Sequence, residues 1–379
     1  MATIVYAMSG EGRGHATRAR VVVEALRDRH RVALFASDCA YSLLAPRYRD
    51  SDVRVFRVPG LQFAYSGPGR VDLFRTVGQA ARFRLALGGY VDEVRPVLDR
   101  IKPDLIVADF EPVVPRAARA AGVPFVSFDH QHYLVVSDLS GLPFALRQRA
   151  RAAAPFVRAL YDWQQAIIVS SFYRMPLRRA FRAATWVGTL IRPEIVGRRP
   201  SAGSHVVAYI RRHAPPSTLA ALAACGRPVR VYGLGERPPE GALRFLAVDE
   251  QRFIDDLAGC AAVVSTAGNQ LVGEALHLGK PMLVMPEERN FEQAVNAHFL
   301  VDSGAGWAEH GALTARRLGA FLEAAPSMRA RIAPEAVNGN EVAVAALERH
   351  IAGRAPALAP PRPIDKRAAR ARPALEVGL

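Results

Sequence analysis

Short apolar runs alternate with segments of helical periodicity along most of the chain. In the first half these runs cover residues 3–8, 32–36, 105–108, 125–128 and 166–170. In the second half they cover residues 206–210, 229–232, 245–248, 261–264 and 282–285. Apolar runs of four to six residues, each followed by a helical segment, are typical of buried parallel strands. The pattern predicts an α/β protein with two doubly wound, Rossmann-like sheets that face each other across a cleft.

The composition of the segments between the runs predicts where the domains divide. Residues 193–204 are rich in Pro and Gly, which is typical of a linker, so residues 1–192 and 205–353 form the two predicted domains. Residues 340–350 have the pattern of a closing helix, and residues 71–100 that of one or two long helices with a break at Gly88 and Gly89. Residues 354–379 are basic, rich in Pro and Ala and without periodicity, and are predicted to be disordered.

A glycine-rich turn from Ser9 to Gly14 joins the first strand to a helix over residues 15–27. A dinucleotide fingerprint would need its third glycine at His15, so a nicotinamide site that uses Asp38 is the weaker interpretation. Gly12 and Gly14 allow a substrate to approach the end of the strand. A neutral imidazole at His15 can take a proton from a hydroxyl group. The alternative for His15 is a side chain that only caps the helix.

Carboxylates at the end of the strand over residues 105–108 can orient that imidazole. Asp109 follows the strand directly, and Glu111 lies two residues further on. The alternative for both is capping of a helix that begins at Pro112.

The strand over residues 125–128 runs into Asp129, His130 and Gln131, which follow it directly. His130 and His132 are alternate loop residues without a third ligand, so no metal site is predicted.

A strand, a turn and a helix between residues 261 and 278 predict a phosphate site. The turn has no large side chain at Ala267 and Gly268, so backbone N–H groups at the helix start can approach a phosphate. Glu274 lies about one turn into the helix, where it can accept from ribose hydroxyls. Glu292 and Gln293 open the next helix and face the same crevice. This combination suits a nucleotide sugar, although Glu292 can also be a solvated first-turn carboxylate.

This stretch resembles the donor-binding signature of GT-B glycosyltransferases, the superfamily of UDP-glycosyltransferases and MurG-type enzymes. The matches are Gly268, Glu274 and the Glu292-Gln293 pair, while Thr266 stands where many members have a His. The segment GEGRGHATR is similar to their first loop, whose His is the proposed base, and Asp109 matches its acidic partner. The segments IVADFEP and SFDHQH resemble the MJ1255-type bacterial and archaeal branch.

The resemblance implies an inverting, metal-independent hexosyltransferase that moves a sugar from a UDP-sugar to a hydroxyl of a lipid, glycan or small molecule. It implies His15 as the base, Asp109 as its orienting partner, and no cofactor beyond the donor. The expected donor-binding residues are Arg211, Arg212, Gly233, Val248, Thr266, Gly268, Asn269, Gln270, Glu274, Glu292 and Gln293. The expected acceptor-binding residues are Gly12, Gly14, Glu111, Asp129, His130 and Gln131. The alternatives are a UDP-GlcNAc 2-epimerase-like enzyme and a non-catalytic nucleotide-sugar-binding protein.

Length and composition are those of a globular protein with room for two cores. The chain has 379 residues, of which 50% are hydrophobic and 22% are charged. Its three cysteines are far apart, so neither a disulfide framework nor a zinc site is indicated. It has no apolar run of about 18 residues and no leader pattern before its first strand, which predicts a cytoplasmic protein.

The formal net charge of +15 favours anionic partners. Within residues 144–182, arginines from Arg147 to Arg182 alternate with aromatic residues, and Asp162 is the single acidic residue. This block and the basic tail can lie on the anionic inner face of a membrane or hold an anionic acceptor. An Arg-rich solvated surface is the alternative. No specific nucleic-acid site is expected, because no recognition module accompanies the basic residues.

Overall fold

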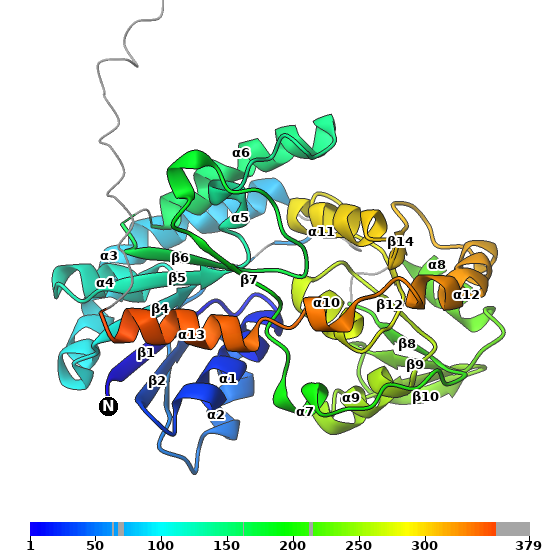
Figure 1. Ribbon diagram of the computed structural model, residues 1–379, viewed down its shortest axis with the longest axis horizontal. Helices are drawn as coiled ribbons and strands as arrows, with labels where there is room; N and C mark the ends of the chain where they lie inside the picture. Colours follow the sequence, from blue (N-terminus) through cyan, green and yellow to red (C-terminus); the bar gives the residue numbers. More distant parts are fainter. Residues whose placement is uncertain (63, 67–71, 162, 212–214, 354–379) are drawn as a thin grey trace, which may run out of the picture.

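The computed structural model describes residues 1–62, 64–66, 72–161, 163–211 and 215–353. They form two seven-stranded sheets that lie side by side, each covered by helices (Figure 1). The first sheet has the strand order β3-β2-β1-β4-β5-β6-β7, and all its pairs are parallel. Its strands are β1 Thr3–Met8, β2 Arg31–Ala36, β3 Arg54–Arg57, β4 Leu105–Asp109, β5 Phe125–Asp129, β6 Ala166–Ser170 and β7 Thr185–Val187.

Helices cover both faces of the first sheet because its strands are apolar on both sides. Ile4, Tyr6 and Met8 of β1 pack toward α1 and α2, whereas Val5 and Ala7 pack toward α3 and α4. The helices of this half are α1 Gly14–Leu26, α2 Asp38–Arg47, α3 Leu73–Ile101, α4 Val113–Ala120, α5 Tyr133–Val136 and α6 Phe144–Leu160, with the short 3-10 helix η1 Arg179–Phe181. The alternation of neighbouring side chains thus builds two cores, as expected for a doubly wound sheet.

The second sheet has the order β10-β11-β9-β8-β12-β13-β14, and only β10 runs antiparallel to its neighbour. Its strands are β8 Val206–Tyr209, β9 Val229–Tyr232, β10 Arg237–Glu240, β11 Leu243–Leu246, β12 Ala262–Ser265, β13 Met282–Val284 and β14 Gly306–Ala308. Its helices are α7 Pro193–Val196, α8 Pro216–Ala223, α9 Glu250–Gly259, α10 Asn269–His277, α11 Phe291–Asp302 and α12 Ala315–Arg329, with the 3-10 helix η2 Pro334–Ala336. Both predicted doubly wound sheets are therefore present.

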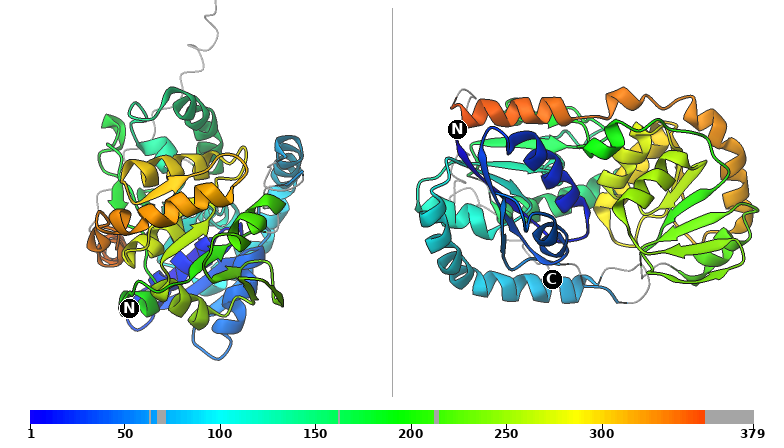
Figure 2. Two further views of the ribbon diagram at one scale, coloured as in Figure 1. Left: turned by 90° about the vertical axis from the view of Figure 1, so that its right-hand side faces the viewer. Right: turned by 90° about the horizontal axis from the view of Figure 1, so that it is seen from below.

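The last helix, α13 (Asn340–Ile351), returns to the first sheet (Figures 1 and 2). Its buried residues Ala343, Ala346 and Leu347 belong to the same core as β1 and α1. The end of the chain therefore crosses the boundary between the halves a second time. This crossing adds apolar burial that ties the two halves together.

Two sequence predictions within this fold need correction. Residues 73–101 form one continuous helix, and no break occurs at Gly88 and Gly89. Both glycines are exposed and a Cβ there would meet open space, so they weaken the helix without interrupting it. The strand expected at residues 245–248 is β11, which begins and ends two residues earlier.

Gly273 in α10 provides a test of how closely this helix packs against the chain leaving β7. A Cβ at Gly273 would overlap the side chain of Thr189, whereas a Cβ at Gly319 in α12 would meet nothing within 4 Å. We expect Gly273→Ala to lower the free energy of unfolding by about 1–3 kcal/mol through overpacking. The matched change Gly319→Ala should raise it by up to about 1 kcal/mol, because Ala is the better helix former. Chemical denaturation measures both, and equal effects would contradict the close packing.

Candidate active site

His15 and Asp109 meet at the carboxyl ends of β1 and β4. His15 lies in the first turn of α1, and Asp109 is the last residue of β4, paired in register with Met8 of β1. The Nδ1 atom of His15 is 2.8 Å from Oδ1 of Asp109. The side chains are nearly closed to solvent, with exposed fractions of 9% for His15 and 0% for Asp109. The structure therefore brings together the two residues that the sequence selected as base and orienting partner.

The contacts of Nδ1 define the tautomer of His15. Asp109 accepts from Nδ1, so in the neutral imidazole this nitrogen carries the proton and Nε2 has the lone pair. The Nη2 group of Arg18 lies 3.0 Å from Nδ1, but it donates to Oδ1 of Asp109 at 2.6 Å. A protonated Nδ1 cannot also accept from Arg18, so the carboxylate is the shared partner of both groups. The arrangement leaves Nε2 as the atom that can take a proton from a substrate.

Arg18 is a site residue that the sequence analysis missed. Its guanidinium donates to both oxygens of Asp109, with Nε 2.9 Å from Oδ2, and Tyr6 donates its hydroxyl to Oδ2 at 3.3 Å. Burial by itself raises the pKa of Asp109, but the charges of Arg18 and His15 outweigh burial and hold the pKa below its ordinary value. Arg18 is three residues after His15, so both lie on one face of α1; this spacing was the available signal.

A second buried His–Asp pair follows β5. Oδ2 of Asp129 is 2.7 Å from Nδ1 of His132, and Oδ1 accepts from the backbone N–H of the same residue. Tyr161 stacks on the imidazole ring of His132 and donates its hydroxyl to Oδ2 of Asp129 at 3.4 Å. Both oxygens of Asp129 thus have partners within the protein. The expected acceptor role of Asp129 would require an exchange of these contacts.

His130 and Gln131 reach from the first half to the second. Nδ1 of His130 is 3.1 Å from the carbonyl of Ser170, and its Nε2 is 3.0 Å from Oδ1 of Asn296 in α11. Gln131 donates to Glu292, also in α11, at 3.0 Å. Burial lowers the pKa of His130. These two expected acceptor residues therefore lie where the two sheets meet.

Glu111 has the capping role that the sequence left open. Its two oxygens accept from the backbone N–H groups of Val113 and Val114 at the start of α4. Burial raises the pKa of Glu111 to about 7, although these hydrogen bonds favour the charged form. The contacts give its carboxylate a structural role and leave Asp109 as the partner of His15.

On the donor side, Glu274 is buried in an ion pair. Arg192 donates to both of its oxygens, at 2.8 and 2.7 Å, and Gln270 donates to Oε1 at 3.1 Å. Arg192 also donates to Glu250 at 3.0 Å, and Arg20 of α1 contacts Glu250 as well. The network joins the helices α1, α9 and α10 and the segment that precedes α7. A ribose could contact Glu274 only if it replaced some of the hydrogen bonds of this network.

Arg211 lies two residues beyond the carboxyl end of β8. Its Nη1 donates to Glu287 at 3.1 Å and to the Tyr65 hydroxyl at 3.2 Å, and its Nη2 is 3.5 Å from Glu11 in the glycine-rich turn. Gln293 holds the loop of Glu287 through two hydrogen bonds, of 2.8 and 3.1 Å. Arg212, also expected to bind the donor, lies outside the described residues.

The remaining donor residues surround the start of α10 and the edge of the second sheet. Gly268 precedes the first turn of α10, which has no side-chain cap. Asn269 donates to the carbonyl of Ser170, and Thr266 is partly exposed. Gly233 has a φ of +92°, where a Cβ would also overlap the carbonyl of Ile210, so the position requires glycine. Val248 packs partly buried against the second core.

The two acceptor-side glycines have different surroundings. Gly12 has a φ of +79°, and a Cβ there would meet nothing within 4 Å, whereas a Cβ at Gly14 would lie 3.5 Å from Gln270 of α10. The glycine-rich turn therefore borders α10 as well as β1. Across the part of the chain that the structure describes, no group of three or more His, Cys, Asp or Glu side chains could hold a metal ion.

No helix in the described ranges is both long and apolar enough to cross a bilayer.

Comparisons with known proteins agree on one family and one fold. A family model described as "Glycosyl transferase family 1" matches residues 2–326. The solved structure of CalG4, the calicheamicin glycosyltransferase, superposes with a TM-score of 0.63 at 17% identity, over 93% of this chain and 99% of that chain. The structure of Phytolacca americana UGT2, complexed with UDP-2fluoro-glucose and pterostilbene, superposes with a TM-score of 0.64 at 14% identity and with the same coverage. The structure of LpCGTa in complex with UDP superposes with a TM-score of 0.63 at 17% identity, also with the same coverage.

A search of curated proteins finds no match. At these identities the structural likeness establishes the fold alone, which is GT-B.

The buried pair of Arg18 and Asp109 is testable by a double-mutant cycle at pH 7. Arg18→Gln and Asp109→Asn should each lower the free energy of unfolding by about 3–5 kcal/mol, because each leaves a buried group without its charged partner. The double variant should lose clearly less than the sum. Since the pKa of Asp109 is lowered in the folded state, its stabilisation is present above about pH 4 and is lost as the pH falls further.

The exposed pair Arg95 and Asp92, 4.0 Å apart, is the control and should show coupling of less than about 1 kcal/mol. Additive losses for Arg18 and Asp109 in chemical denaturation would contradict the ion pair.

Proposed function

The chain belongs to glycosyl transferase family 1, and we propose that this glycosyltransferase moves a sugar from a UDP-sugar to a hydroxyl acceptor with inversion at the anomeric carbon. The observation that carries the proposal is the contact of 2.8 Å between Nδ1 of His15 and Oδ1 of Asp109, which makes Nε2 the proton-accepting nitrogen of the neutral imidazole. We further place the chain in the MJ1255-type branch, on the segments that follow β4 and β5.

In the proposed reaction His15 is the general base. The acceptor hydroxyl gives its proton to Nε2 while its oxygen forms a bond to the anomeric carbon. The bond from that carbon to the diphosphate oxygen breaks, and UDP leaves on the opposite face. Asp109 orients the ring and stabilises the imidazolium that forms, as the acidic partner does in related dyads. A single displacement of this kind inverts the configuration.

The proposed donor site supplies positive charge to the leaving diphosphate without a metal ion. The first turn of α10 has no side-chain cap, so its N–H groups can point to a phosphate, and Gly268 leaves open space before it. Arg211 would add a cationic donor, shared with Glu287. Glu274 would accept from the ribose, and Glu292 with Gln293 would hold sugar hydroxyls. Solved relatives bound to UDP or to a UDP-sugar analogue support this class of donor.

The acceptor side is proposed to comprise the glycine-rich turn and the loop after β5. Gly12 and Gly14 border the cleft, and His130 and Gln131 lie where the halves meet. The division into an acceptor-binding half, residues 1–192, and a donor-binding half, residues 205–353, is part of the same proposal. The same proposal includes contact of the basic block from Arg147 to Arg182 with the anionic inner face of a membrane.

Calorimetric titration tests the donor class. We expect UDP to bind with micromolar affinity, more tightly than GDP, dTDP or NAD. Glu274→Gln should weaken UDP at least tenfold, because the amide loses the charge that ribose hydroxyls prefer but can still accept from Arg192. The control Glu348→Gln removes a carboxylate that pairs with Arg29, away from the expected donor residues, and should leave UDP affinity within about twofold. Tight binding of NAD instead of UDP would contradict the proposal.

Substitution of His15 tests the chemistry. In an assay of UDP release from a panel of UDP-sugars and hydroxyl acceptors, His15→Gln should reduce turnover by about 10²–10⁴-fold while UDP affinity is retained. Acceptor-independent conversion of UDP-GlcNAc would indicate the epimerase-like alternative. UDP binding without release in the unmodified protein, over the whole panel, would indicate a nucleotide-sugar-binding protein.

A further inference from the structure

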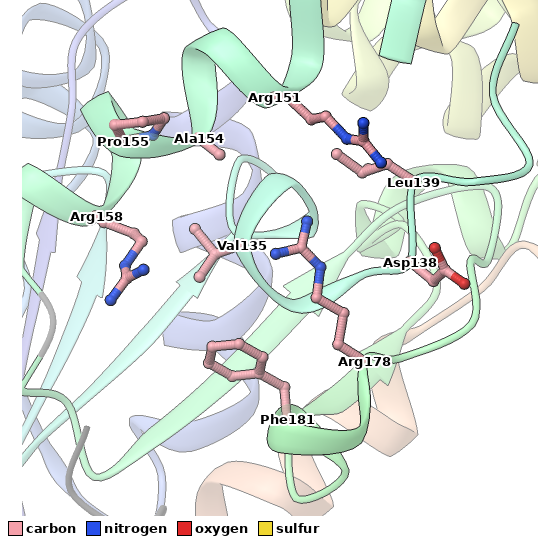
Figure 3. A pocket seen from close by; sticks show the side chains of 9 residues that line it. All are labelled: Val135, Asp138, Leu139, Arg151, Ala154, Pro155, Arg158, Arg178 and Phe181. Atoms are coloured by element: carbon pink, nitrogen blue, oxygen red, sulfur yellow. The ribbon is translucent and has the colours of Figure 1, made fainter. Parts of the chain in front are cut away.

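A cavity of about 390 Å³ opens between α5, α6 and the segment that leads into η1 (Figure 3). Its lining combines apolar side chains with three arginines and one acidic residue. The lining residues are Val135, Asp138, Leu139, Arg151, Ala154, Pro155, Arg158, Arg178 and Phe181. None of them belongs to the donor or acceptor residues assigned above.

The arginines of this cavity lack carboxylate partners. Across the described chain, Arg151, Arg158 and Arg178 form no ion pair within 4.0 Å. Nε of Arg178 donates to the carbonyl of Ser137 at 2.7 Å, which fixes the guanidinium while its terminal nitrogens remain available. Asp138 accepts from the backbone N–H of Ser140 at 2.9 Å. The lining therefore carries a formal charge of +3 from the arginines and −1 from Asp138, or +2 in all.

Charged side chains lie on two sides of the cavity, with Arg158 on one side and Arg151, Arg178 and Asp138 on the other (Figure 3). Arg151 reaches down from α6 and Arg178 reaches up from the segment before η1, so their guanidinium groups extend toward the same space. Val135 lies between Arg178 and Arg158, and Phe181 closes the lower side. Two elements that are distant in sequence thus place positive charge around apolar side chains.

We propose that this cavity binds a phosphate monoester that carries an apolar group. Three arginines with a single carboxylate among them repel one another, and a bound anion removes that repulsion. Guanidinium groups match phosphate oxygens in bidentate geometry, and a phosphate monoester near pH 7 carries a charge of about −1.5 to −2, which balances the lining. Val135, Leu139 and Phe181 would cover the apolar group.

The ester can come from two sources, a soluble metabolite or the headgroup of a phosphatidic-acid-type lipid in a bilayer. Both present the same dianionic phosphate next to hydrocarbon. Binding in the cavity does not depend on sugar transfer, so the site stands or falls separately from the proposed activity.

The test measures the binding of two probes to the full-length protein. Hexyl phosphate is titrated by calorimetry. Phosphatidylcholine vesicles with about 20% phosphatidic acid are used in a sedimentation assay, because anionic lipids attract basic segments. The informative variant is Arg151→Gln with Arg178→Gln. The matched control is Arg149→Gln with Arg174→Gln, which removes the same charge from exposed positions outside the cavity. Thermal unfolding of each variant serves as the control for folding.

We expect saturable binding of at least one probe, weakened at least tenfold in the cavity variant and less than twofold in the control. Binding of hexyl phosphate alone identifies a soluble ester, and binding of the vesicles, with or without hexyl phosphate, identifies a bilayer headgroup. Equal losses in the two variants would show diffuse attraction by the basic surface and would overturn the site. Absence of saturable binding to both probes would overturn it as well.

Discussion

The candidate active site depends on one buried charge, the carboxylate of Asp109. It ends β4 and is contacted by Tyr6 of β1 and by His15 and Arg18 of α1, so it joins three elements of the first half. A carboxylate with no exposure would become neutral without a cation beside it. Arg18 supplies that cation, and the ionised carboxylate then fixes the tautomer and direction of His15. The geometry of the proposed base is therefore a consequence of how Asp109 is neutralised.

The second constraint is the close contact of the two halves at the same edge. Asn269 at the start of α10 donates to the carbonyl of Ser170 after β6, and Asn296 of α11 faces His130 after β5. The carboxyl ends of the parallel strands of both sheets meet there, which is where open α/β sheets bind ligands. Several polar groups of one half form hydrogen bonds with groups of the other in this arrangement. Any ligand between the halves has to replace these hydrogen bonds with its own.

The sequence was sufficient for the fold and for the pairing of His15 with Asp109, but not for the partners of the buried charges. Apolar runs reveal strands because burial on both faces leaves no polar positions, and the residues at strand ends then fall on one edge. Arg18 and Arg192 carry no such mark, because an arginine in an Arg-rich chain looks like surface. The cap formed by Glu111 and the pair of Asp129 with His132 are local, but which oxygen is occupied depends on tertiary packing.

The network around Arg192 shows how a buried carboxylate can serve a ligand. If Glu274 exchanged Arg192 for ribose hydroxyls, a buried guanidinium without another partner would be left unpaired. An unpaired buried charge costs about 3–5 kcal/mol of free energy. Arg192, however, already donates to Glu250 through Nη1 at 3.0 Å. This second carboxylate keeps the guanidinium paired while Glu274 exchanges partners. Glu250 in turn is held by Arg20 of α1, so hydrogen bonds connect the proposed ribose contact to the helix that carries His15.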